Sequence, residues 1–549
     1  METFKLKVEK FGLKAQGRTY SSICKISEEQ FEVEIKEEFS IYITTKKPIY
    51  IEKCFVDIKI DVPEDFKFFR NGFQSWSPSF EINYKQHFDK CLLPVLRNHY
   101  LDPKSFREEE SSSFTYLNSK GTYLLFLPEK YSEYISFQLI NEKILRINIE
   151  VGRNIFPIFE TSKIKLVEQN SPLLANKLLK KVYGWTSWYY YYRNITPEKL
   201  HKNIKAIKNI PIKLDYFQID DGWQKSIGDW EENLEFKGQL EAIASSILES
   251  GVNPGIWLAP FVVEKKSFLF EKRKSWLIKN TNGEPKPVGF NPLWSGHFFA
   301  LDPTDPEVLD YLTERIIHLK KIGFKLFKFD FLYSMMVPQP ELKVPRFDQF
   351  RKGISALREA IGEDSTLLGC GAPLVLEPWM YDILRIGPDT KDGWEDALTQ
   401  LIKFQGRTSA KNSLRNTITR SFLNGRYFLH DPDVVFLKTR KLTKNEKDAI
   451  LITNFLLAHV IFFSDPIYNL ANEDFALLLK LKDYENFVLD NVSSTNDIYK
   501  IEGHVGNNKI AGIINLSNLK FKIGFQKKEA LFGSMEQYVE PHSAGVYRV

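Results

Sequence analysis

The sequence predicts a multidomain α/β protein, in which a central (β/α)8 barrel (a TIM barrel) lies between an N-terminal β-sandwich domain and a small C-terminal antiparallel β domain. Three patterns along the chain predict this fold. Residues 1–172 show repeated strand patterns, residues 173–485 alternate apolar strands with amphipathic helices, and residues 486–549 return to strands. A chain of 549 residues is also too long for one small hydrophobic core, so several domains are expected.

The N-terminal region alternates polar and apolar residues, as the half-buried strands of an antiparallel sheet do. The clearest runs are Phe31–Lys36, Ser40–Thr45, Val56–Val62 and Ile144–Val151, with polar, turn-like residues between them. This region shows no long helical periodicity. We therefore expect a large antiparallel β domain built as a sandwich of packed sheets.

Eight apolar segments of the middle region are candidate barrel strands. In chain order they are Val182–Trp188, Leu214–Asp221, Asn253–Pro260, Phe324–Asp330, Ser365–Gly371, Asp382–Asp389, Arg426–Asp431 and His459–Asp465. Eight strands separated by helical segments are typical of a (β/α)8 barrel. A doubly wound open sheet is the structural alternative, because it shows the same alternation of strands and helices.

Two of the helices between these strands have recognisable ends. Thr196 before Pro197 and Asp305 before Pro306 each combine an N-cap residue with proline at the first helical position. An amphipathic apolar pattern follows both signals. Gly323 is placed to end the second helix, because glycine readily adopts the left-handed conformation of a helix C-terminus.

Composition and charge argue against nucleic-acid and membrane partners. Hydrophobic residues make up 43% and charged residues 26% of the chain, which is typical of a soluble globular protein. The net charge of +5 is mild and Lys and Glu are interspersed, so we expect no nucleic-acid partner. The longest apolar runs, such as Leu457–Phe463, end well short of a membrane span.

Cysteine usage and the N-terminal residues predict a cytoplasmic protein. Cys24, Cys54, Cys91 and Cys370 show neither paired nor metal-ligand spacing, which is typical of reduced thiols. Met1–Lys10 alternates polar and apolar residues and lacks the apolar core of a signal peptide. Abundant Lys and Glu with only four Cys and five Met favour a thermophilic source. The oligomeric state stays open, with a homo-oligomer as one alternative.

Two of the predicted strands end in an aspartate, Asp330 in the fourth and Asp389 in the sixth. A carboxylate that ends an apolar strand is costly unless it meets water, a partner or a substrate. In a barrel the carboxyl ends of all strands share one face, where the site of such enzymes lies. Two carboxylates there suggest glycoside cleavage, in which one attacks and the other donates a proton. The alternative is that each aspartate only caps the following helix.

Other strand ends carry side chains able to hydrogen-bond a polyol. They are Asp220, Asp221, Lys328, Cys370 and Arg385. Four of them also have a structural interpretation: the aspartate pair as a turn, Lys328 as a buried ion-pair partner, and Cys370 as a small buried hydrophobe. The binding interpretation gains weight because all five fall on the same predicted rim.

Three tryptophans, Trp185, Trp188 and Trp257, are predicted near the same level of the barrel. An indole face stacks well on the apolar face of a sugar ring, although an isolated tryptophan is more often a core residue. The carboxylates come without histidines at ligand spacing, so no metal site is expected. We expect no cofactor either.

On these residues the barrel resembles glycoside hydrolase family 36, the bacterial and archaeal α-galactosidases. The motifs are Trp185–Tyr189, Phe217–Asp221, Ile227–Trp230, Pro254–Trp257, Phe327–Leu332, Leu368–Gly371, Arg385–Thr390 and Asp431–Asp433, in the order found in the family. Asn71–Ser77 resembles the family's N-terminal motif, whose tryptophan, here Trp76, reaches toward the sugar pocket. The segments around Lys328 and Asp330 and around Asp389 are the specific ones.

The resemblance implies an exo-acting, retaining α-galactosidase for melibiose- or raffinose-type sugars. It implies that Asp330 is the nucleophile and Asp389 the general acid/base. The substrate-binding residues that it implies are Asp220 and Asp221 for the 4- and 6-hydroxyls, Lys328 for the 3- and 4-hydroxyls, Arg385 and Cys370 for the 2-hydroxyl side, and Trp188, Trp257 and Trp76 as pocket walls. Within the family, an α-N-acetylgalactosaminidase and a raffinose-synthase-like galactosyltransferase are alternatives. Outside it, a non-catalytic sugar-binding barrel remains.

The chain departs from the family pattern in three places: Lys391–Trp394, Glu377–Tyr381 and His430. We interpret these positions as loops near the leaving-group side. They therefore leave the aglycone preference open, while the reaction expected from the paired carboxylates is unaffected.

Overall fold

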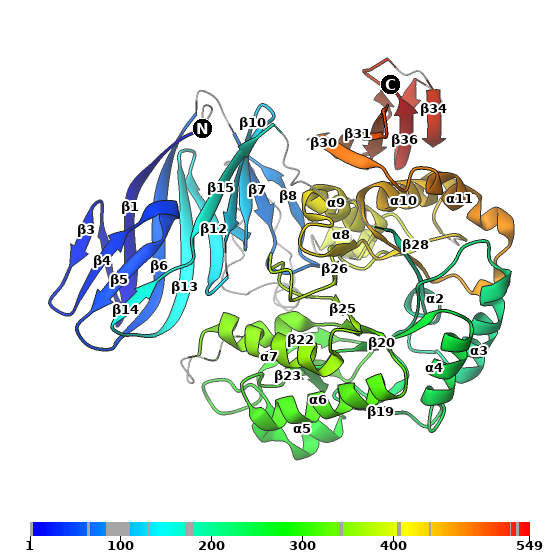
Figure 1. The fold of residues 1–549 in the computed structure, drawn as a ribbon, viewed down its shortest axis with the longest axis horizontal. Coiled ribbons are helices and arrows are strands. Elements are labelled where there is room, and N and C mark those ends of the chain that lie inside the picture. The colour runs from blue at the N-terminus through cyan, green and yellow to red at the C-terminus, as the bar shows by residue number, and fades with distance from the viewer. Residues whose placement is uncertain are drawn as a thin grey trace.

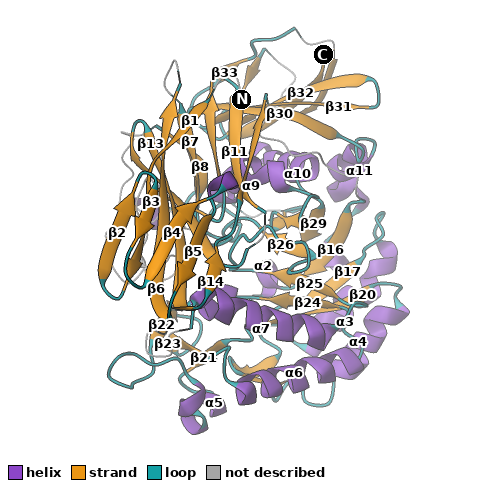
Figure 2. Cartoon of the chain, turned by 60° about the vertical axis from the view of Figure 1, so that its left-hand side comes forward, coloured by secondary structure: helices purple, strands orange, loops and turns teal. Residues whose placement is uncertain are grey.

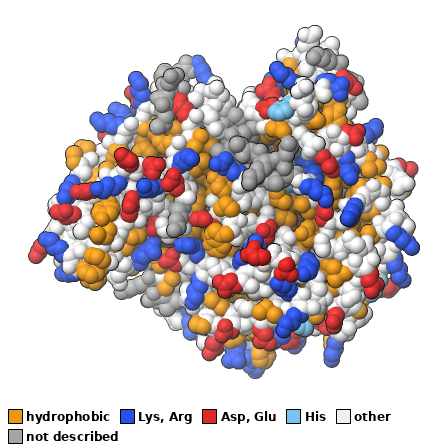
Figure 3. Space-filling model, in the orientation of Figure 1, with side chains coloured by type: hydrophobic (Ala, Val, Ile, Leu, Met, Phe, Trp, Pro, Cys, Tyr) orange, Lys and Arg blue, Asp and Glu red, His pale blue; other side chains and the backbone are white. Residues whose placement is uncertain are grey.

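The computed structural model describes residues 4–62, 66–83, 110–129, 131–170, 180–337, 339, 344–402, 408–438, 441–526, 529–533 and 537–549. Figure 1 shows three parts: a body of N-terminal strands in blue and cyan, a central body of strands and helices, and a C-terminal sheet in red. On the visible face, Figure 3 shows acidic and basic side chains of the described residues interspersed. Among the described helices, none is long and apolar enough to cross a membrane.

The N-terminal part contains three antiparallel sheets. The largest has the order β2-β1-β6-β13-β12-β9. Its strands are β1 (Lys5–Ala15), β2 (Arg18–Ser22), β6 (Ile49–Asp61), β9 (Glu110–Ser112), β12 (Tyr134–Asn141) and β13 (Ile144–Ile155). In β13 every second residue from Leu145 to Val151 is buried, which is the period-two pattern of a strand with one face on the core.

The other two sheets complete the sandwich. The five-stranded sheet, in the order β15-β11-β10-β7-β8, contains β7 (Lys67–Asn71), β8 (Ser79–Ile82), β10 (Thr115–Ser119), β11 (Thr122–Pro128) and β15 (Ile164–Gln169). The four-stranded sheet, in the order β14-β5-β4-β3, contains β3 (Lys25–Ser27), β4 (Phe31–Ile35), β5 (Ile41–Thr45) and β14 (Ile158–Glu160). Their inward side chains share one hydrophobic core. The prediction of an N-terminal β sandwich is confirmed.

The central body is a parallel barrel. Its strands are β16 (Val182–Thr186), β17 (Tyr216–Ile219), β20 (Asn253–Leu258), β24 (Leu326–Phe329), β25 (Thr366–Gly369), β26 (Ile383–Arg385), β27 (Leu429–Asp431), β28 (Val434–Val435) and β29 (Val460–Phe463). Strand β27 pairs with β26, and β28 pairs with β29. The two strands are separated only by Pro432 and Asp433, so together they occupy the position of the seventh barrel strand and close the sheet. Closure confirms the (β/α)8 barrel and excludes the doubly wound alternative.

Helices surround the barrel, as Figure 2 shows for α3, α4, α6 and α7. The longer helices are α3 (Pro197–Ala206), α4 (Leu240–Glu249), α6 (Pro306–Lys321), α7 (Arg346–Ile361), α9 (Ala410–Arg420) and α10 (Lys444–Leu457). The shorter ones are α2 (Trp188–Tyr191), α5 (Phe268–Lys272), α8 (Ala397–Leu401) and α11 (Ala476–Lys482).

The predicted helix ends are confirmed. The Thr196 hydroxyl accepts a hydrogen bond from the backbone N–H of Lys199, and the Asp305 carboxylate accepts one from that of Glu307. Each cap satisfies a backbone donor that has no partner within the helix. Gly323 follows the end of α6 with φ of 116°, a conformation that few other residues adopt.

The C-terminal part is a five-stranded antiparallel sheet in the order β30-β31-β32-β36-β34, with a small second sheet of β33 and β35. Its strands are β30 (Val488–Thr495), β31 (Ile498–Val505), β32 (Asn508–Asn515), β33 (Phe521–Lys522), β34 (Glu529–Gly533), β35 (Tyr538–Val539) and β36 (Ser543–Arg548). The prediction of a small C-terminal antiparallel β domain is confirmed.

Candidate active site

A cavity of about 210 Å³ lies at the carboxyl ends of the barrel strands. This volume is below the range of about 300–1,000 Å³ of typical small-molecule sites, so it suits a single sugar unit. Eight of the residues predicted for the site form part of its wall: Trp76, Trp188, Asp220, Asp221, Trp257, Lys328, Asp330 and Asp389. The barrel thus brings together side chains that are far apart in sequence.

Asp330 follows β24 and lies deep in the cavity wall, with only 8% of its surface exposed. Its Oδ2 accepts a hydrogen bond from the indole Nε1 of Trp257 (2.9 Å), and its Oδ1 accepts one from the backbone N–H of Phe331 (2.9 Å). The nearby Cys370 side chain also acts to lower the pKa of this carboxylate. Burial raises the pKa of Asp330, although nearby Lys328 and these hydrogen bonds act in the opposite direction.

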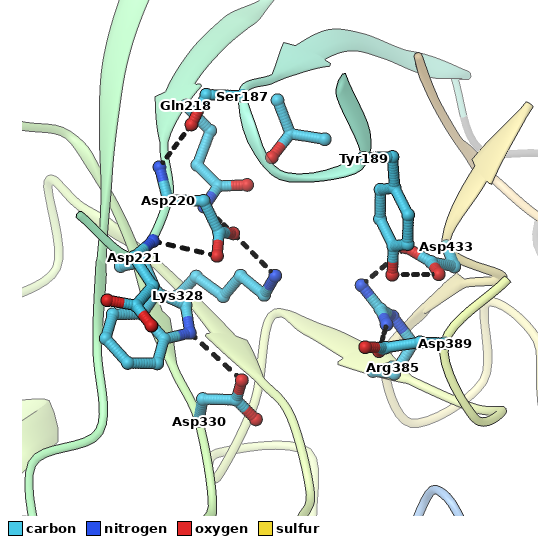
Figure 4. Close-up of polar contacts among 12 residues, drawn as sticks. Ser187, Tyr189, Gln218, Asp220, Asp221, Lys328, Asp330, Arg385, Asp389 and Asp433 are labelled. Atoms are coloured by element: carbon cyan, nitrogen blue, oxygen red, sulfur yellow. Dashed lines mark hydrogen bonds and ion pairs between the residues drawn. The ribbon is translucent and has the colours of Figure 1, made fainter. Parts of the chain in front are cut away.

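Asp389 is the more accessible of the two aspartates, with 37% of its side chain exposed. Its Oδ1 contacts the guanidinium Nη1 of Arg385 at 3.1 Å. Figure 4 shows Asp389 and Arg385 across the view from Lys328 and Asp330. The charge of Asp389 contributes to the raised pKa of Asp330, which places the two carboxylates within electrostatic reach of each other.

Asp220 and Lys328 form a buried ion pair in the cavity wall, with 2.8 Å between Oδ2 and Nζ (Figure 4). Gln218 donates a second hydrogen bond to Oδ2 (2.7 Å), and Ser187 accepts one from the backbone N–H of Asp220 (2.9 Å). Burial alone would lower the pKa of Lys328, but the charges of Asp220 and of other nearby groups, Asp330 among them, together raise it. The structural and the binding interpretations of Lys328 therefore both apply, since the pair lines the cavity.

Asp221 is held by residues that the sequence did not single out. Its Oδ2 accepts a hydrogen bond from Trp294 Nε1 (3.0 Å), its Oδ1 accepts one from Gln224 (2.6 Å), and Arg193 pairs with it at 3.3 Å. Burial raises the pKa of Asp221, and the charge of Arg193 opposes this. Trp294 lies in the cavity wall, so it is a site residue missed from the sequence.

Trp294 lies between two strands of a small antiparallel sheet inserted after β20. This sheet consists of β21 (Val262–Glu264), β22 (Pro287–Asn291) and β23 (Gly296–Ala300). A signal for it exists in the sequence, because the segment between β20 and α6 is much longer than an ordinary strand-to-helix loop. Long connections at this barrel face often carry binding residues.

Arg385 and Cys370 are both buried. Neither belongs to the residues that line the cavity, although both were predicted to contact the sugar. Arg385 is held by three carboxylates: Asp431 (3.1 Å), Asp433 (2.8 Å) and Asp389 (3.1 Å). Burial would lower its pKa, but Asp431 and Asp433 raise it. Arg385 is therefore fixed in place next to Asp389.

Asp433 is the second residue that the sequence analysis missed. It sits between β27 and β28 with φ of 78°, and its Oδ2 accepts hydrogen bonds from the hydroxyl of Tyr189 and the backbone N–H of Thr390 (2.6 Å). Burial, above all, raises its pKa to about 7. A strained backbone at an acid that contacts Arg385 suggests a functional position.

We expect Asp433→Asn to flatten the dependence of stability on pH. Because the pKa of Asp433 rises from 3.8 to about 7 on folding, the folded state holds this proton to higher pH than the unfolded state does. Stability is therefore lost as the pH rises from about 4 to about 7, and asparagine removes that loss. Apparent Tm values, measured at one scan rate between about pH 5 and pH 8, check this.

Asp497→Asn is the matched control. Burial acts to raise the pKa of Asp497, but the charges of Arg415 and Lys411 outweigh burial and lower the pKa. This group therefore titrates below the measured pH range. The control should lower Tm by the same amount at every pH. An Asp433→Asn variant with the wild-type slope would contradict the prediction.

The tryptophans divide into wall and core residues. Trp188, Trp257 and Trp76 line the cavity. Trp185, predicted near the same level, instead stacks on Phe217 with 4.2 Å between ring centroids and is fully buried. Strand residues alternate in direction, so Trp185 of β16 packs into the core rather than against the cavity.

Trp76 reaches the cavity from the N-terminal part of the same chain. It lies between β7 and β8, and its indole packs edge-on against Phe331 with 5.0 Å between centroids. In this structure the Trp76 part of the cavity wall therefore comes from the same chain as the barrel.

The three departures from the family pattern have structural contacts away from the cavity wall. His430 is fully buried and stacks on Phe428, while Trp394 stacks on His542 of the C-terminal part at 4.5 Å. Glu377 accepts a hydrogen bond from the backbone N–H of Tyr131. None of these positions lines the cavity, and their place on the leaving-group side stays a prediction.

The family model described as Melibiase matches residues 162–350, which include Asp330 but not Asp389. The α-galactosidase AgaA of Geobacillus stearothermophilus is 28% identical over 157 residues, or 27% of this chain and 19% of that protein. The α-galactosidase of Escherichia coli is 25% identical over 141 residues, or 24% and 19%. The alignments thus span about a fifth of these curated relatives.

Solved structures match over most of the chain. The α-galactosidase of Thermus thermophilus in complex with p-nitrophenyl α-D-galactopyranoside has a TM-score of 0.68 at 25% identity, covering 89% of this chain and 97% of that one. The α-galactosidase AgaB of G. stearothermophilus has a TM-score of 0.60 at 12% identity, over 99% and 81%, and shows the shared fold.

A (β/α)8 barrel with two flanking β domains and paired carboxylates at the strand ends has the architecture of a glycoside hydrolase. The partial match to the Melibiase family model and these structural neighbours agree with that architecture. The chain is thus similar in sequence and in fold to the α-galactosidases of glycoside hydrolase family 36, the family that its sequence motifs resemble.

Proposed function

We propose that this chain is an exo-acting, retaining α-galactosidase that removes terminal α-linked galactose from small oligosaccharides of the melibiose and raffinose type. One observation carries the proposal: a cavity of about 210 Å³ has Asp330, Asp389 and the Asp220–Lys328 pair in its wall. A cavity for one sugar unit suits removal of a terminal residue. Complexes of relatives with stachyose and with raffinose support the substrate class.

In the first step, an oxygen of Asp330 attacks the anomeric carbon and the bond from that carbon to the leaving oxygen breaks. Asp389 donates its proton to the leaving oxygen, and a galactosyl ester of Asp330 forms. The hydrogen bonds from Trp257 and from the backbone N–H of Phe331 hold the Asp330 carboxylate in one orientation. Such positioning lowers the entropic part of the barrier.

In the second step, water releases the sugar. Asp389, now a carboxylate, takes a proton from water while the water oxygen bonds to the anomeric carbon and the ester to Asp330 breaks. Two inversions keep the configuration. The greater exposure of Asp389 suits this role, since both the leaving group and the incoming water must reach it.

The sugar hydroxyls would be recognised by side chains that are already fixed. Asp220, Asp221 and Lys328 are buried and hydrogen-bonded before any substrate binds, so little entropy is lost on binding. They would read the 3-, 4- and 6-hydroxyls, including the axial 4-hydroxyl of galactose. On the 2-hydroxyl side, Arg385 does not line the cavity itself, but three carboxylates fix its guanidinium next to Asp389.

The test is a panel of 4-nitrophenyl glycosides. We expect kcat/KM for the α-galactoside to exceed that for the α-glucoside and the N-acetyl-α-galactosaminide by about 10²-fold or more, because buried polar groups lose their partners with the wrong sugar. Equal or faster cleavage of the N-acetyl substrate would indicate an α-N-acetylgalactosaminidase. Products formed mainly by transfer to an added sugar acceptor would indicate a galactosyltransferase, and binding without turnover a sugar-binding barrel.

We also propose a cytoplasmic location and a thermophilic source. The described cysteines Cys24, Cys54 and Cys370 are free thiols, as is typical of a reducing compartment. Abundant Lys and Glu with few Cys and Met support the thermophilic source.

A further inference from the structure

The segment that carries Trp76 belongs to the N-terminal sandwich but is fastened to the barrel. We call residues 71–79, between β7 and β8, the Trp76 loop. Its Ser75 N–H donates to the backbone oxygen of Ala372 (2.8 Å), and Gln74 forms a β-bridge with Pro373. The indole packs closely: a Cβ added at Gly371 would lie 2.8 Å from Trp76 Cη2. A small shift of this loop would therefore change the cavity wall.

Helix α9 holds the loop from the other side. Arg420, at the end of α9, is fully buried, and its guanidinium donates to Asn71 Oδ1 (3.1 Å), Ser75 O (2.7 Å) and Ser77 O (2.9 Å). The last two oxygens flank Trp76 directly. One turn earlier, Asn416 donates to Ser77 O (3.0 Å) and accepts from the Ser79 N–H (3.0 Å).

Arg420 also reaches the strand that leads to the proposed acid. Its Nη1 donates to the backbone oxygen of Ile386 at 2.6 Å, directly after Arg385 and three residues before Asp389. One guanidinium thus binds the Trp76 loop and the end of β26 at the same time.

The burial of the Arg420 guanidinium costs folding free energy, so its retention indicates a functional role. Burial, with nearby Arg70, lowers the pKa of Arg420 to about 9, and within the described part of the chain no carboxylate pairs with it. A buried charge that is balanced mainly by carbonyl oxygens costs stability. The planar five-donor guanidinium can serve several acceptors in fixed directions, whereas lysine cannot.

We propose that Arg420 and Asn416, the α9 clamp, are positioning residues of the sugar site, which place Trp76 against the cavity and link that position to the strand of Asp389. This inference rests on the proposed function. Neither residue lines the cavity, so the clamp acts through Trp76 and Ile386.

The experiment compares Arg420→Lys with Arg415→Lys. Arg415 lies on the same helix but pairs with Asp497 of the C-terminal part at 3.0 Å, so it is a matched control. With 4-nitrophenyl α-galactoside, we expect Arg420→Lys to raise KM about tenfold with a smaller change in kcat, and Arg415→Lys to leave KM unchanged. In a Trp76→Ala background the effect of Arg420→Lys on KM should fall below about twofold, because residues that act through one contact are not additive.

Hydrogen exchange gives a readout that does not depend on activity. Amides of residues 71–79 should exchange faster in Arg420→Lys than in Arg415→Lys, whichever sugar the protein cleaves. If Arg420→Lys does not fold, Asn416→Ala carries the same tests with an expected threefold rise in KM. An unchanged KM and exchange rate, or KM effects that multiply with Trp76→Ala, would overturn the inference. A wild-type protein without galactosidase activity would instead overturn the proposed function, and exchange would still decide on the clamp.

Discussion

Asp330→Gly should lower kcat for 4-nitrophenyl α-galactoside by about 10⁴-fold or more, because removal of a catalytic nucleophile leaves only binding and positioning effects. Asp330 is the buried carboxylate of the cavity, and each of its oxygens accepts a hydrogen bond that orients it. Without it, no galactosyl ester can form. Initial rates with wild type and variant, at saturating substrate, measure the loss.

Added azide should restore turnover of the Asp330→Gly variant. The missing side chain leaves space on the face from which Asp330 would attack, and a small anion can enter it. The azide nitrogen then bonds to the anomeric carbon while 4-nitrophenolate leaves, so the configuration inverts once. The expected product is β-galactosyl azide, which NMR identifies by its anomeric coupling.

Asp465→Gly is the matched control for this rescue. Asp465 also follows a barrel strand, β29, and is nearly buried, but its carboxylate accepts hydrogen bonds from the backbone N–H groups of Leu437 and Lys438 outside the cavity. Azide should not accelerate this variant. An Asp330→Ala protein that kept wild-type activity would refute the assignment of the nucleophile.

The barrel and its strand-end aspartates could be predicted from the sequence because both depend on local signals. An apolar run buried on both faces identifies a parallel strand, and a carboxylate at its end stands out against it. Asp330 and Asp389 could be placed on one rim by counting strands alone. The closure of the sheet through β27 and β28 then follows from the topology.

The rest depends on contacts between distant segments, which no local pattern records. Trp294 reaches Asp221 only because an inserted hairpin folds back over the barrel. Asp433 is close to Arg385 only once β27 and β28 have formed the seventh strand position of the barrel. Trp185 and Trp188 are equally apolar and three residues apart, yet Trp185 packs in the core and Trp188 lines the cavity. The direction in which each side chain points depends on the tertiary structure.

The role of Arg385 also depends on contacts with distant segments. A strand-end arginine can bind substrate or hold other protein groups, and both interpretations fit its sequence. In the structure its guanidinium is occupied by Asp389, Asp431 and Asp433, so it holds the proposed acid in place. Sequence could identify the residue but not its partners.

Asp389→Ala should slow substrates according to their leaving groups. Melibiose and raffinose lose a sugar alkoxide, which needs a proton, and we expect their hydrolysis to fall by about 10²- to 10⁴-fold, the usual contribution of a general acid. 4-Nitrophenolate leaves without protonation, so formation of the galactosyl ester from the aryl substrate should be affected far less. Pre-steady-state kinetics should then show a burst of 4-nitrophenol, because the variant also lacks the base for the second step.

Azide distinguishes the two aspartates by the product that each variant forms. In Asp389→Ala, azide attacks the galactosyl ester of Asp330 without needing a base, so two inversions give α-galactosyl azide. The glycine variant of Asp330 gives the β anomer instead. Asp392→Ala is the control, because Asp392 accepts hydrogen bonds from the backbone of Lys441 and Leu442 and does not line the cavity. Equal slowing of aryl and sugar substrates, or a β-azide from Asp389→Ala, would show that Asp389 is not the acid/base and that another group donates the proton.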